Sequence, residues 1–210
     1  RGEIFGISGL IGAGRTELLR LIYGADHADS GTVAVGNPLK TVSIRSPMDA
    51  VRHGIALITE DRKGEGLLMS QSISSNIGLG NMEQLSRAGF IKGEQERALA
   101  RRQIDAMGIR CCGPEQVVSQ LSGGNQQKVV IGRWLERDCG VLLFDEPTRG
   151  IDIGAKFDIY RLLADLTREG KALVVVSSDL RELMLICDRI GVMSAGRLTD
   201  TFERDSWRQE

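Results

Sequence analysis

A glycine-rich stretch at residues 9–16, Gly-Leu-Ile-Gly-Ala-Gly-Arg-Thr, constrains this 210-residue chain more than any other feature. It follows an apolar run at 4–8 and precedes an amphipathic pattern at 15–23, which predict a strand and a helix. The stretch matches the pattern G-x-x-x-x-G-K-[ST] except at Arg15. Glycines in such a unit let backbone N–H groups face a phosphate, and the helix N-terminus adds about half a positive charge. We therefore predict a phosphate site in an α/β fold.

The side chains of this loop suit phosphate chemistry with one exception. Thr16 is expected to place its hydroxyl on Mg²⁺. Arg15 keeps the positive charge of the usual lysine, but its planar fork is not an equivalent substitute, so we expect phosphate binding with altered geometry. A ligand-free turn remains the alternative for the loop taken alone. The remaining predicted contacts are Gly9, Gly12, Ala13 and Gly14.

A second motif, Leu-Ser-Gly-Gly-Asn-Gln-Gln-Lys at residues 121–128, precedes a predicted helix. Ser122 is a suitable helix cap, and the two glycines leave backbone donors unshielded, which makes another anion site. A capped helix with a flexible entry would explain the Ser-Gly-Gly triplet alone. We predict nucleotide contacts at Ser122, Gly123, Gly124 and Gln126.

Two carboxylates end the apolar run at residues 141–144. Ligands of open α/β sheets bind at the carboxyl ends of strands, where Asp145 and Glu146 would lie. Asp145 is expected to support Mg²⁺, and Glu146 to orient or deprotonate an attacking water. An isolated Asp-Glu pair is usually a solvated strand end. Here it follows two other phosphate-related motifs, and that order supports a common interpretation.

Strand and helix patterns alternate along the chain, which predicts a mainly parallel sheet. From 72 to about 107 the pattern becomes helical, so we expect one domain, residues 1–210, with an inserted helical subdomain. Its predicted bounds are 71–129, and those of the core are about 1–70 and 130–210.

Composition excludes several classes of function. The net charge of -1 and an aromatic content of 4% argue against nucleic-acid binding. No charged leader and no apolar run of the ~20 residues that a membrane helix needs are present, so any membrane role would require a partner. No Cys-x-x-Cys pair occurs, and His27 and His53 lie away from the cysteines. We expect structural roles in a reducing cytosol for all four cysteines, Cys111, Cys112, Cys139 and Cys187.

These motifs together resemble those of an ATP-binding cassette. Residues 9–16 resemble Walker A, 121–128 the signature motif and 141–146 Walker B. Residues 148–152 resemble the loop whose Asp152 reaches the opposing cassette. The resemblance implies a P-loop NTPase core with a mainly parallel sheet, an antiparallel β edge region and an inserted helical subdomain.

Four strings narrow the resemblance: GAGRTE, LITEDRKGEGL, LSGGNQQKV and DEPTRGIDIGAK. They are similar to the C-terminal cassette of twin-cassette ATPases that power bacterial ribose, galactose and xylose importers. The resemblance implies ATP and Mg²⁺, a partner cassette in the N-terminal half of the same polypeptide, membrane permease subunits and, indirectly, a periplasmic sugar-binding protein. It implies a peripheral location on the cytoplasmic face of the inner membrane. The abrupt start at Arg1 fits a fragment of such a chain.

Three residues depart from an active cassette. Besides Arg15, Glu60 stands where a glutamine usually contacts Mg²⁺ and water, and Ser178 occupies the place of the switch histidine. The loss of one positioned transition-state contact costs roughly 10²–10³ in rate. Because Glu146 is retained, we expect hydrolysis to be weakened rather than lost.

Two other functions remain open. A cassette that binds ATP without useful hydrolysis would fit the three departures, whereas Asp145 and Glu146 oppose it. A cytosolic cassette acting on ribosomes or DNA fits less well, because the stretch from Thr16 to the signature is too short for a long coiled coil. The charged loop at 60–66 is either a solvated turn or a nucleotide sensor, in which Arg62 and Lys63 could reach phosphates.

Overall fold

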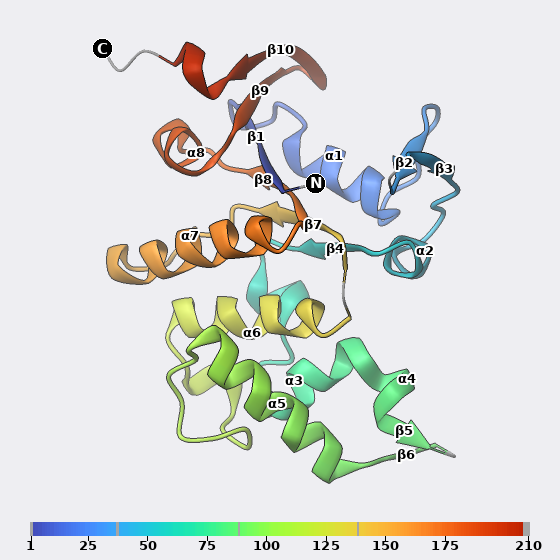
Figure 1. Cartoon of the computed structure of the whole chain (residues 1–210), viewed down its shortest axis with the longest axis vertical. Helices are drawn as coiled ribbons and strands as arrows, with labels where there is room; N and C mark the ends of the chain where they lie inside the picture. The colour runs from blue at the N-terminus through green and yellow to red at the C-terminus, as the bar shows by residue number, and fades with distance from the viewer. Residues whose placement is uncertain (1, 37, 88, 138, 208–210) are drawn as a thin grey trace. The chain divides into compact units, whose positions relative to one another are not determined.

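The computed structural model describes residues 2–36, 38–87, 89–137 and 139–207, which form two compact units (Figure 1). The first unit comprises Arg1–Ile58, Cys139–Pro147 and Leu163–Glu210, and the second comprises Thr59–Asp138 and Thr148–Leu162. The predicted helical subdomain, 71–129, lies within the second unit. That unit extends further partly because a single helix continues from Gly123 to Leu135, and a continuous hydrogen-bonded helix does not divide at residue 129.

The first unit is built on a six-stranded sheet in the order β10-β9-β1-β8-β7-β4 (Figure 1). All neighbours are parallel except β9 and β10, which are antiparallel at one edge. This arrangement confirms the predicted mainly parallel sheet with an antiparallel β edge. The strands are β1 (Glu3–Gly9), β4 (Ile55–Ile58), β7 (Val141–Asp145), β8 (Ala172–Val176), β9 (Arg189–Ser194) and β10 (Arg197–Glu203).

The register of the central strands places their carboxyl ends next to one another at one edge of the sheet. Ile7 of β1 and Asp145 of β7 both pair with Val176 of β8, and Gly9 pairs with Met193 of β9. Parallel strands place their carboxyl ends at the same edge of a sheet, where open α/β folds bind ligands. The glycine-rich loop and the two acidic residues therefore start from neighbouring positions.

Three helices of the first unit cover this sheet: α1 (Arg15–Tyr23), α2 (Pro47–Arg52) and α8 (Leu180–Ile186). Helices α1 and α2 contact β4, and α8 contacts β1. Helix α2 begins with Ser46 as its cap, since the Asp49 N–H donates to Ser46 Oγ (3.3 Å) and Pro47 lies in the first turn. A separate hairpin joins β2 (Val33–Val35) to β3 (Lys40–Val42).

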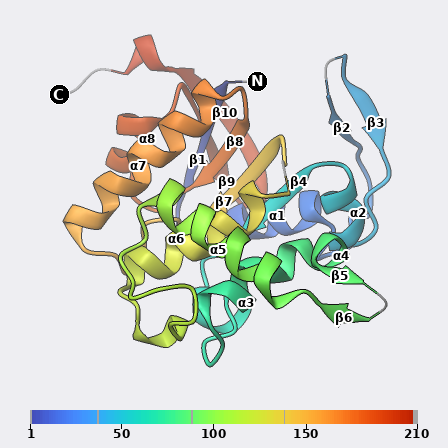
Figure 2. The ribbon, with the colours of Figure 1, turned by 60° about the horizontal axis from the view of Figure 1, so that its bottom comes forward.

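The second unit contains α3 (Ile73–Gly78), α4 (Met82–Leu85), α5 (Gly93–Met107) and α6 (Gly123–Leu135). Helices α3, α5 and α6 contact one another (Figure 2). The prediction of continuous helical structure from 72 to 107 is wrong in one place, where a short hairpin, β5 (Ser86–Arg87) and β6 (Phe90–Ile91), interrupts it. Gly89 adopts a left-handed φ of 82° there, which favours a turn over a helix. Helix α7 (Ile153–Arg168) has residues in both units.

Shorter elements complete the chain. Residues Arg62–Gly66 form a single π-helical turn, η1. Three 3₁₀ turns follow at Leu79–Asn81 (η2), Val118–Gln120 (η3) and Arg204–Ser206 (η4). Among the described residues, no helix combines the length and the apolar character needed to cross a bilayer.

The four cysteines do not share one environment. Cys139 and Cys187 are buried, at 1% and 0% exposure, as expected of structural cysteines. Cys111 is half-buried and Cys112 is exposed, so burial does not support a structural role for the adjacent pair as it does for the other two. Both belong to the loop that follows α5.

We expect Leu143→Ala in β7 to lower the free energy of unfolding by about 2–5 kcal/mol, because it leaves a cavity in the sheet core. Leu143 is 1% exposed, whereas Leu39 is 74% exposed. The same truncation at Leu39 provides the matched control and should stay within about 0.5 kcal/mol. Denaturant unfolding measures both. Equal shifts in the two variants would contradict the position of Leu143 in the core.

Candidate nucleotide site

The backbone of the glycine-rich loop requires its glycines. Gly12 and Gly14 have left-handed φ values of 80° and 93°, and Gly14 is the N-terminal cap of α1. A Cβ at Gly9 would lie 2.5 Å from the Met193 carbonyl oxygen. Backbone of this kind comes close to a bound group without steric interference. The conformation fits a phosphate cradle.

The loop is anchored at Ala13 and exposed at its tip. The Ala13 N–H donates to the Leu10 carbonyl (3.0 Å), and its own carbonyl accepts from the Gly196 N–H (3.0 Å). Ala13 is 5% exposed, whereas Leu10 and Ile11 are 86% and 95% exposed. Thr16 lies in the first turn of α1 and is exposed, so its hydroxyl can reach a ligand.

The two acidic residues lie where β7 ends. Asp145 is 3% exposed and Glu146 is 9% exposed. Glu146 has a φ of 46°, and its N–H donates to the Val176 carbonyl (3.0 Å). Left-handed backbone at a residue other than glycine costs about 1–3 kcal/mol, and such residues cluster at functional sites. The strain is consistent with a functional role for this carboxylate.

Arg15 turns toward the strand ends and contacts Glu146. Its Nη1 donates to the Ser177 carbonyl (2.9 Å), and its Nη2 lies 3.7 Å from Glu146 Oε1. Both side chains are largely buried, at 10% and 9% exposure. The motifs predict that Arg15 binds phosphate and that Glu146 positions water, and they do not predict a contact between the two side chains. No sequence pattern predicts it, because it depends on where β7 and α1 meet.

Ser178 follows the residue that Arg15 contacts. It is exposed, whereas Ser177 is buried. The Ser177 hydroxyl accepts from the Asp179 N–H (3.1 Å), and the Asp179 carboxylate caps α8 by accepting from the Arg181 N–H (2.9 Å). This turn therefore presents a short hydroxyl at position 178, the residue predicted to replace the switch histidine.

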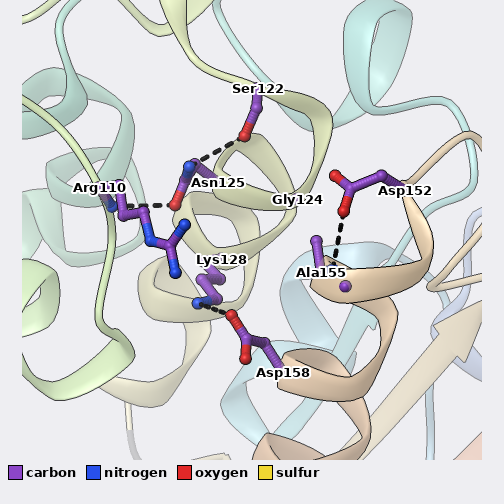
Figure 3. Close-up of a pocket in the computed structure, with 9 residues that line it drawn as sticks. Arg110, Ser122, Gly124, Asn125, Lys128, Asp152, Ala155 and Asp158 are labelled. Atoms are coloured by element: carbon purple, nitrogen blue, oxygen red, sulfur yellow. Dashed lines mark hydrogen bonds and ion pairs between the residues drawn. The ribbon is translucent and has the colours of Figure 1, made fainter.

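The signature segment belongs to the second unit and is organised by Asn125 (Figure 3). Its Nδ2 donates to Ser122 Oγ (2.9 Å), and its Oδ1 accepts from the Arg110 N–H (2.9 Å). Neither Asn125 nor Arg110 was among the predicted site residues. The sequence could have pointed to Asn125, because it lies within the motif at 121–128, but no motif contains Arg110.

Gln126 differs from the other predicted contacts of this motif. It is 5% exposed, and its amide donates to the carbonyls of Val118 (3.3 Å) and Leu121 (3.1 Å). Both carbonyls belong to the segment that enters α6. The position fits support of the signature segment rather than contact with nucleotide.

The start of α6 packs closely against the start of α7. A Cβ at Gly124 would lie 2.6 Å from the Ala155 Cβ. Lys128 Nζ donates to Asp158 (3.1 Å), and Asp152 caps α7 by accepting from the Ala155 N–H (2.9 Å) (Figure 3). A cavity of about 220 Å³ adjoins these contacts. Its lining residues are Arg110, Ser122, Gly124, Asn125, Lys128, Asp152, Gly154, Ala155 and Asp158.

The charged loop at 60–66 is ordered by specific contacts. Glu60 accepts a hydrogen bond from Arg149, which the sequence analysis did not assign. Arg62 Nη1 donates to the Arg149 carbonyl (3.1 Å), and burial lowers the pKa of the Arg62 guanidinium below its ordinary value. Asp61 caps the π turn by accepting from the N–H groups of Lys63 and Gly64. The loop is thus tied to the segment that follows Walker B.

The sheet order, the glycine-rich loop and the signature helix define an ATP-binding cassette fold. The family model described as ABC transporter matches residues 1–149, more than half of the chain. The chain belongs to the ABC transporter family.

Curated relatives match over the whole chain. A relative from Burkholderia cenocepacia (strain HI2424), an import ATP-binding protein named for ribose, galactose and methyl galactoside, is 50% identical over 100% of this chain and 41% of its own length. Ribose import ATP-binding protein RbsA 3 of Rubrobacter xylanophilus (strain DSM 9941) is 49% identical, with coverages of 100% and 41%. The chain therefore spans about 41% of the length of these relatives.

Solved structures support the fold. A dimeric ATP-binding cassette in a post-hydrolysis state, bound to ADP and Pi, superposes with a TM-score of 0.80 at 24% identity, covering 98% of this chain and 87% of that one. A nucleotide-free cassette from an ABC transporter gives 0.80 at 20% identity, with coverages of 96% and 81%.

The contact between Gly124 and Ala155 gives a steric prediction. Gly124→Ala should cost about 1–3 kcal/mol of unfolding free energy through overpacking, although alanine favours a helix. In an Ala155→Gly background the same change should cost less, because the opposing methyl group is gone. Chemical denaturation of the two single variants and the double variant measures the coupling. Strictly additive costs would show that these two positions do not touch.

Proposed function

We propose that this chain is the second cassette of a bacterial sugar-importer ATPase, and that its own nucleotide site hydrolyses ATP slowly. The names of the relatives support a role in carbohydrate import, and the coverage of about 41% leaves room for another cassette in their chains. In this proposal the partners are that cassette, membrane permease subunits and, indirectly, a periplasmic sugar-binding protein. The chain acts at the cytoplasmic face of the inner membrane. These relatives give no support to a cytosolic role outside transport.

The residues of the first unit fit MgATP. The left-handed backbone at Gly12 and Gly14 offers a cradle for phosphates, and the N-terminus of α1 favours their negative charge. The Thr16 hydroxyl is exposed and the Asp145 carboxylate lies at the end of β7, so these two groups would hold Mg²⁺. When bound, the ion neutralises charge on the β- and γ-phosphates.

The contact between Arg15 and Glu146 is the observation that carries the proposal of a slow site. In this conformation the Arg15 guanidinium lies 3.7 Å from the Glu146 carboxylate. It therefore competes with the water that this carboxylate would orient. A movement of Arg15 from Glu146 to phosphate would leave a carboxylate of 9% exposure without that cation. Breaking a buried ion pair in this way is costly. The pair therefore opposes the catalytic arrangement.

Two further positions favour slow turnover. Glu60 carries a negative charge where the family has a neutral amide, and it is held by Arg149. Ser178 provides no imidazole for the γ-phosphate or for Glu146. Each change removes a positioned group, and one such group is worth roughly 10²–10³ in rate.

The signature segment is proposed to serve the partner cassette. Ser122, Gly123 and Gly124 precede and begin α6, and Asn125 holds the Ser122 hydroxyl in place. The backbone donors at this helix start would face the γ-phosphate of ATP that the partner binds. The unimpaired signature and the impaired phosphate site give the domain unequal roles in two composite sites. Asp152 is proposed to reach the partner from the following loop.

A cassette that binds ATP without useful hydrolysis is the second candidate. The same Arg15–Glu146 contact favours it, because a pair that never opened during turnover would abolish hydrolysis at this site. The presence of Asp145 and Glu146 favours slow hydrolysis instead. Single-turnover measurements with the partner site inactivated distinguish a low rate from none.

In the complete ATPase subunit, Glu146→Gln should reduce steady-state ATP hydrolysis by less than about twofold, because the partner's site carries most turnover. The matched control is the same substitution at the partner cassette's catalytic glutamate, which should lower the rate by roughly 10²-fold or more. Both variants should still bind ATP. If Glu146→Gln abolished hydrolysis as completely as the control, the slow-site proposal would fail.

Replacing the three departing residues by those usual in the family tests whether they slow hydrolysis. We expect the combination of Arg15→Lys, Glu60→Gln and Ser178→His to raise hydrolysis at this site by at least about tenfold, since each restores a positioned group. The rate is measured with the partner's catalytic glutamate replaced, so that only this site contributes. A folded triple variant that binds ATP and turns over no faster would show that other features limit the rate.

A further inference from the structure

The adjacent pair Cys111 and Cys112 has no role in the nucleotide site. The two residues lie in the loop between α5 and η3, and both thiols are free. Cys111 is half-buried and Cys112 is exposed, in contrast to the buried Cys139 and Cys187. A cavity of about 470 Å³ opens beside the pair, lined also by Ile104 and Asp105 of α5. Both residues therefore border an opening at the surface, and neither is fully buried.

The geometry of neighbouring residues does not suit an ordinary disulfide. Consecutive Cα atoms lie about 3.8 Å apart across a trans peptide, whereas disulfides usually join Cα atoms 4.4–6.8 Å apart. A single atom inserted between the sulfurs relaxes this restriction, because the sulfurs then stand further apart than the ~2.05 Å of an S–S bond. The pair suits a ligand that bonds to both sulfurs.

The surroundings limit which ligand this can be. Among the residues that the structure describes, no group of three or more His, Cys, Asp or Glu side chains is placed to hold a metal ion. Structural zinc takes four protein ligands, so two thiols are too few for it. Trivalent arsenic forms three bonds, and in an organic arsenical one of these bonds is to carbon. Two thiols therefore complete its coordination.

We propose that Cys111 and Cys112 form a dithiol site for trivalent arsenicals. With phenylarsine oxide, both thiol hydrogens leave with the oxo oxygen as one water molecule, and two As–S bonds replace the As–O bonding. Arsenic stays trivalent and no oxidant is required. The open cavity beside Ile104 leaves room for the phenyl group.

The loop connects this site to the signature segment. Arg110, directly before Cys111, donates its N–H to Asn125 Oδ1 (2.9 Å), and Asn125 in turn donates to Ser122 (2.9 Å). On the other side, the Cys112 N–H donates to Gln116 Oε1 (2.7 Å). A ring that closes across residues 111 and 112 restricts the backbone between these two anchored points. Occupancy of the dithiol therefore disturbs the hydrogen bond that holds Asn125.

The buried cysteines provide internal controls. Burial raises the pKa of the Cys187 thiol to about 12, so almost no thiolate is present at neutral pH. Cys139 is 1% exposed and is separated from the pair in the sequence. Neither should take up the reagent in the folded protein.

The test uses phenylarsine oxide on the full polypeptide that contains this chain, without nucleotide, followed by peptide mapping by mass spectrometry. We expect one phenylarsenic group on the peptide that contains Cys111 and Cys112, stable to excess glutathione and removed by dithiothreitol. Cys111→Ser and Cys112→Ser should each weaken binding by roughly 10²-fold or more, because each removes the chelate. Equal affinity in either variant and the wild type, or labelling only at other cysteines, would overturn the site.

Amide hydrogen exchange at Arg110 tests the connection to the signature segment. Exchange should accelerate in the arsenical complex and stay unchanged in reagent-treated Cys112→Ser. Unchanged exchange in a fully labelled wild type would refute the connection while leaving the dithiol site in place. Neither measurement involves ATP hydrolysis, so both outcomes are independent of the proposed slow site.

Discussion

The parallel register of β1, β7 and β8 is the constraint on which the candidate nucleotide site depends. Ile7 and Asp145 both pair with Val176, so the loop after β1, the acidic pair after β7 and the serines after β8 all begin at one edge of the sheet. A slip of one residue in any strand would turn the buried side chains of that strand to the opposite face. The packing of the apolar core therefore determines the register of the strands. The register in turn determines which polar residues lie together at the edge of the sheet.

This arrangement gives Arg15 a partner that a phosphate loop alone would not predict. Its guanidinium meets the Ser177 carbonyl and the Glu146 carboxylate because α1 starts where β7 and β8 end. A fork with several donors can satisfy both acceptors at once, and a lysine ammonium has a different reach and shape. The substitution therefore changes more than phosphate binding. It couples the phosphate loop to the residue that would position water.

The second unit is organised around polar side chains that hold backbone. Asn125 fixes the Ser122 hydroxyl and the Arg110 N–H, while Gln126 fixes the segment that enters α6. Such contacts preserve the shape of a loop whose glycines contribute no side chains. The hydrogen bond from the Arg110 N–H to Asn125 also connects the signature segment to the loop that contains the adjacent cysteines. The proposed slow site and the proposed dithiol site therefore rest on residues of different units.

The sequence alone determined the family, the mainly parallel sheet of the first unit and the motifs, because glycine spacing, apolar runs and caps are local signals. Helix α1 begins and ends at the predicted residues, 15 and 23. The hairpin at β5 and β6 was missed, since two strands of two residues each are too short to leave a periodic pattern. Tertiary structure alone decided that Arg15 contacts Glu146, that Arg149 contacts Glu60 and that Gln126 is buried. These contacts join residues distant in sequence or depend on the burial of one helix face, and no local pattern encodes which polar groups meet once the core has packed.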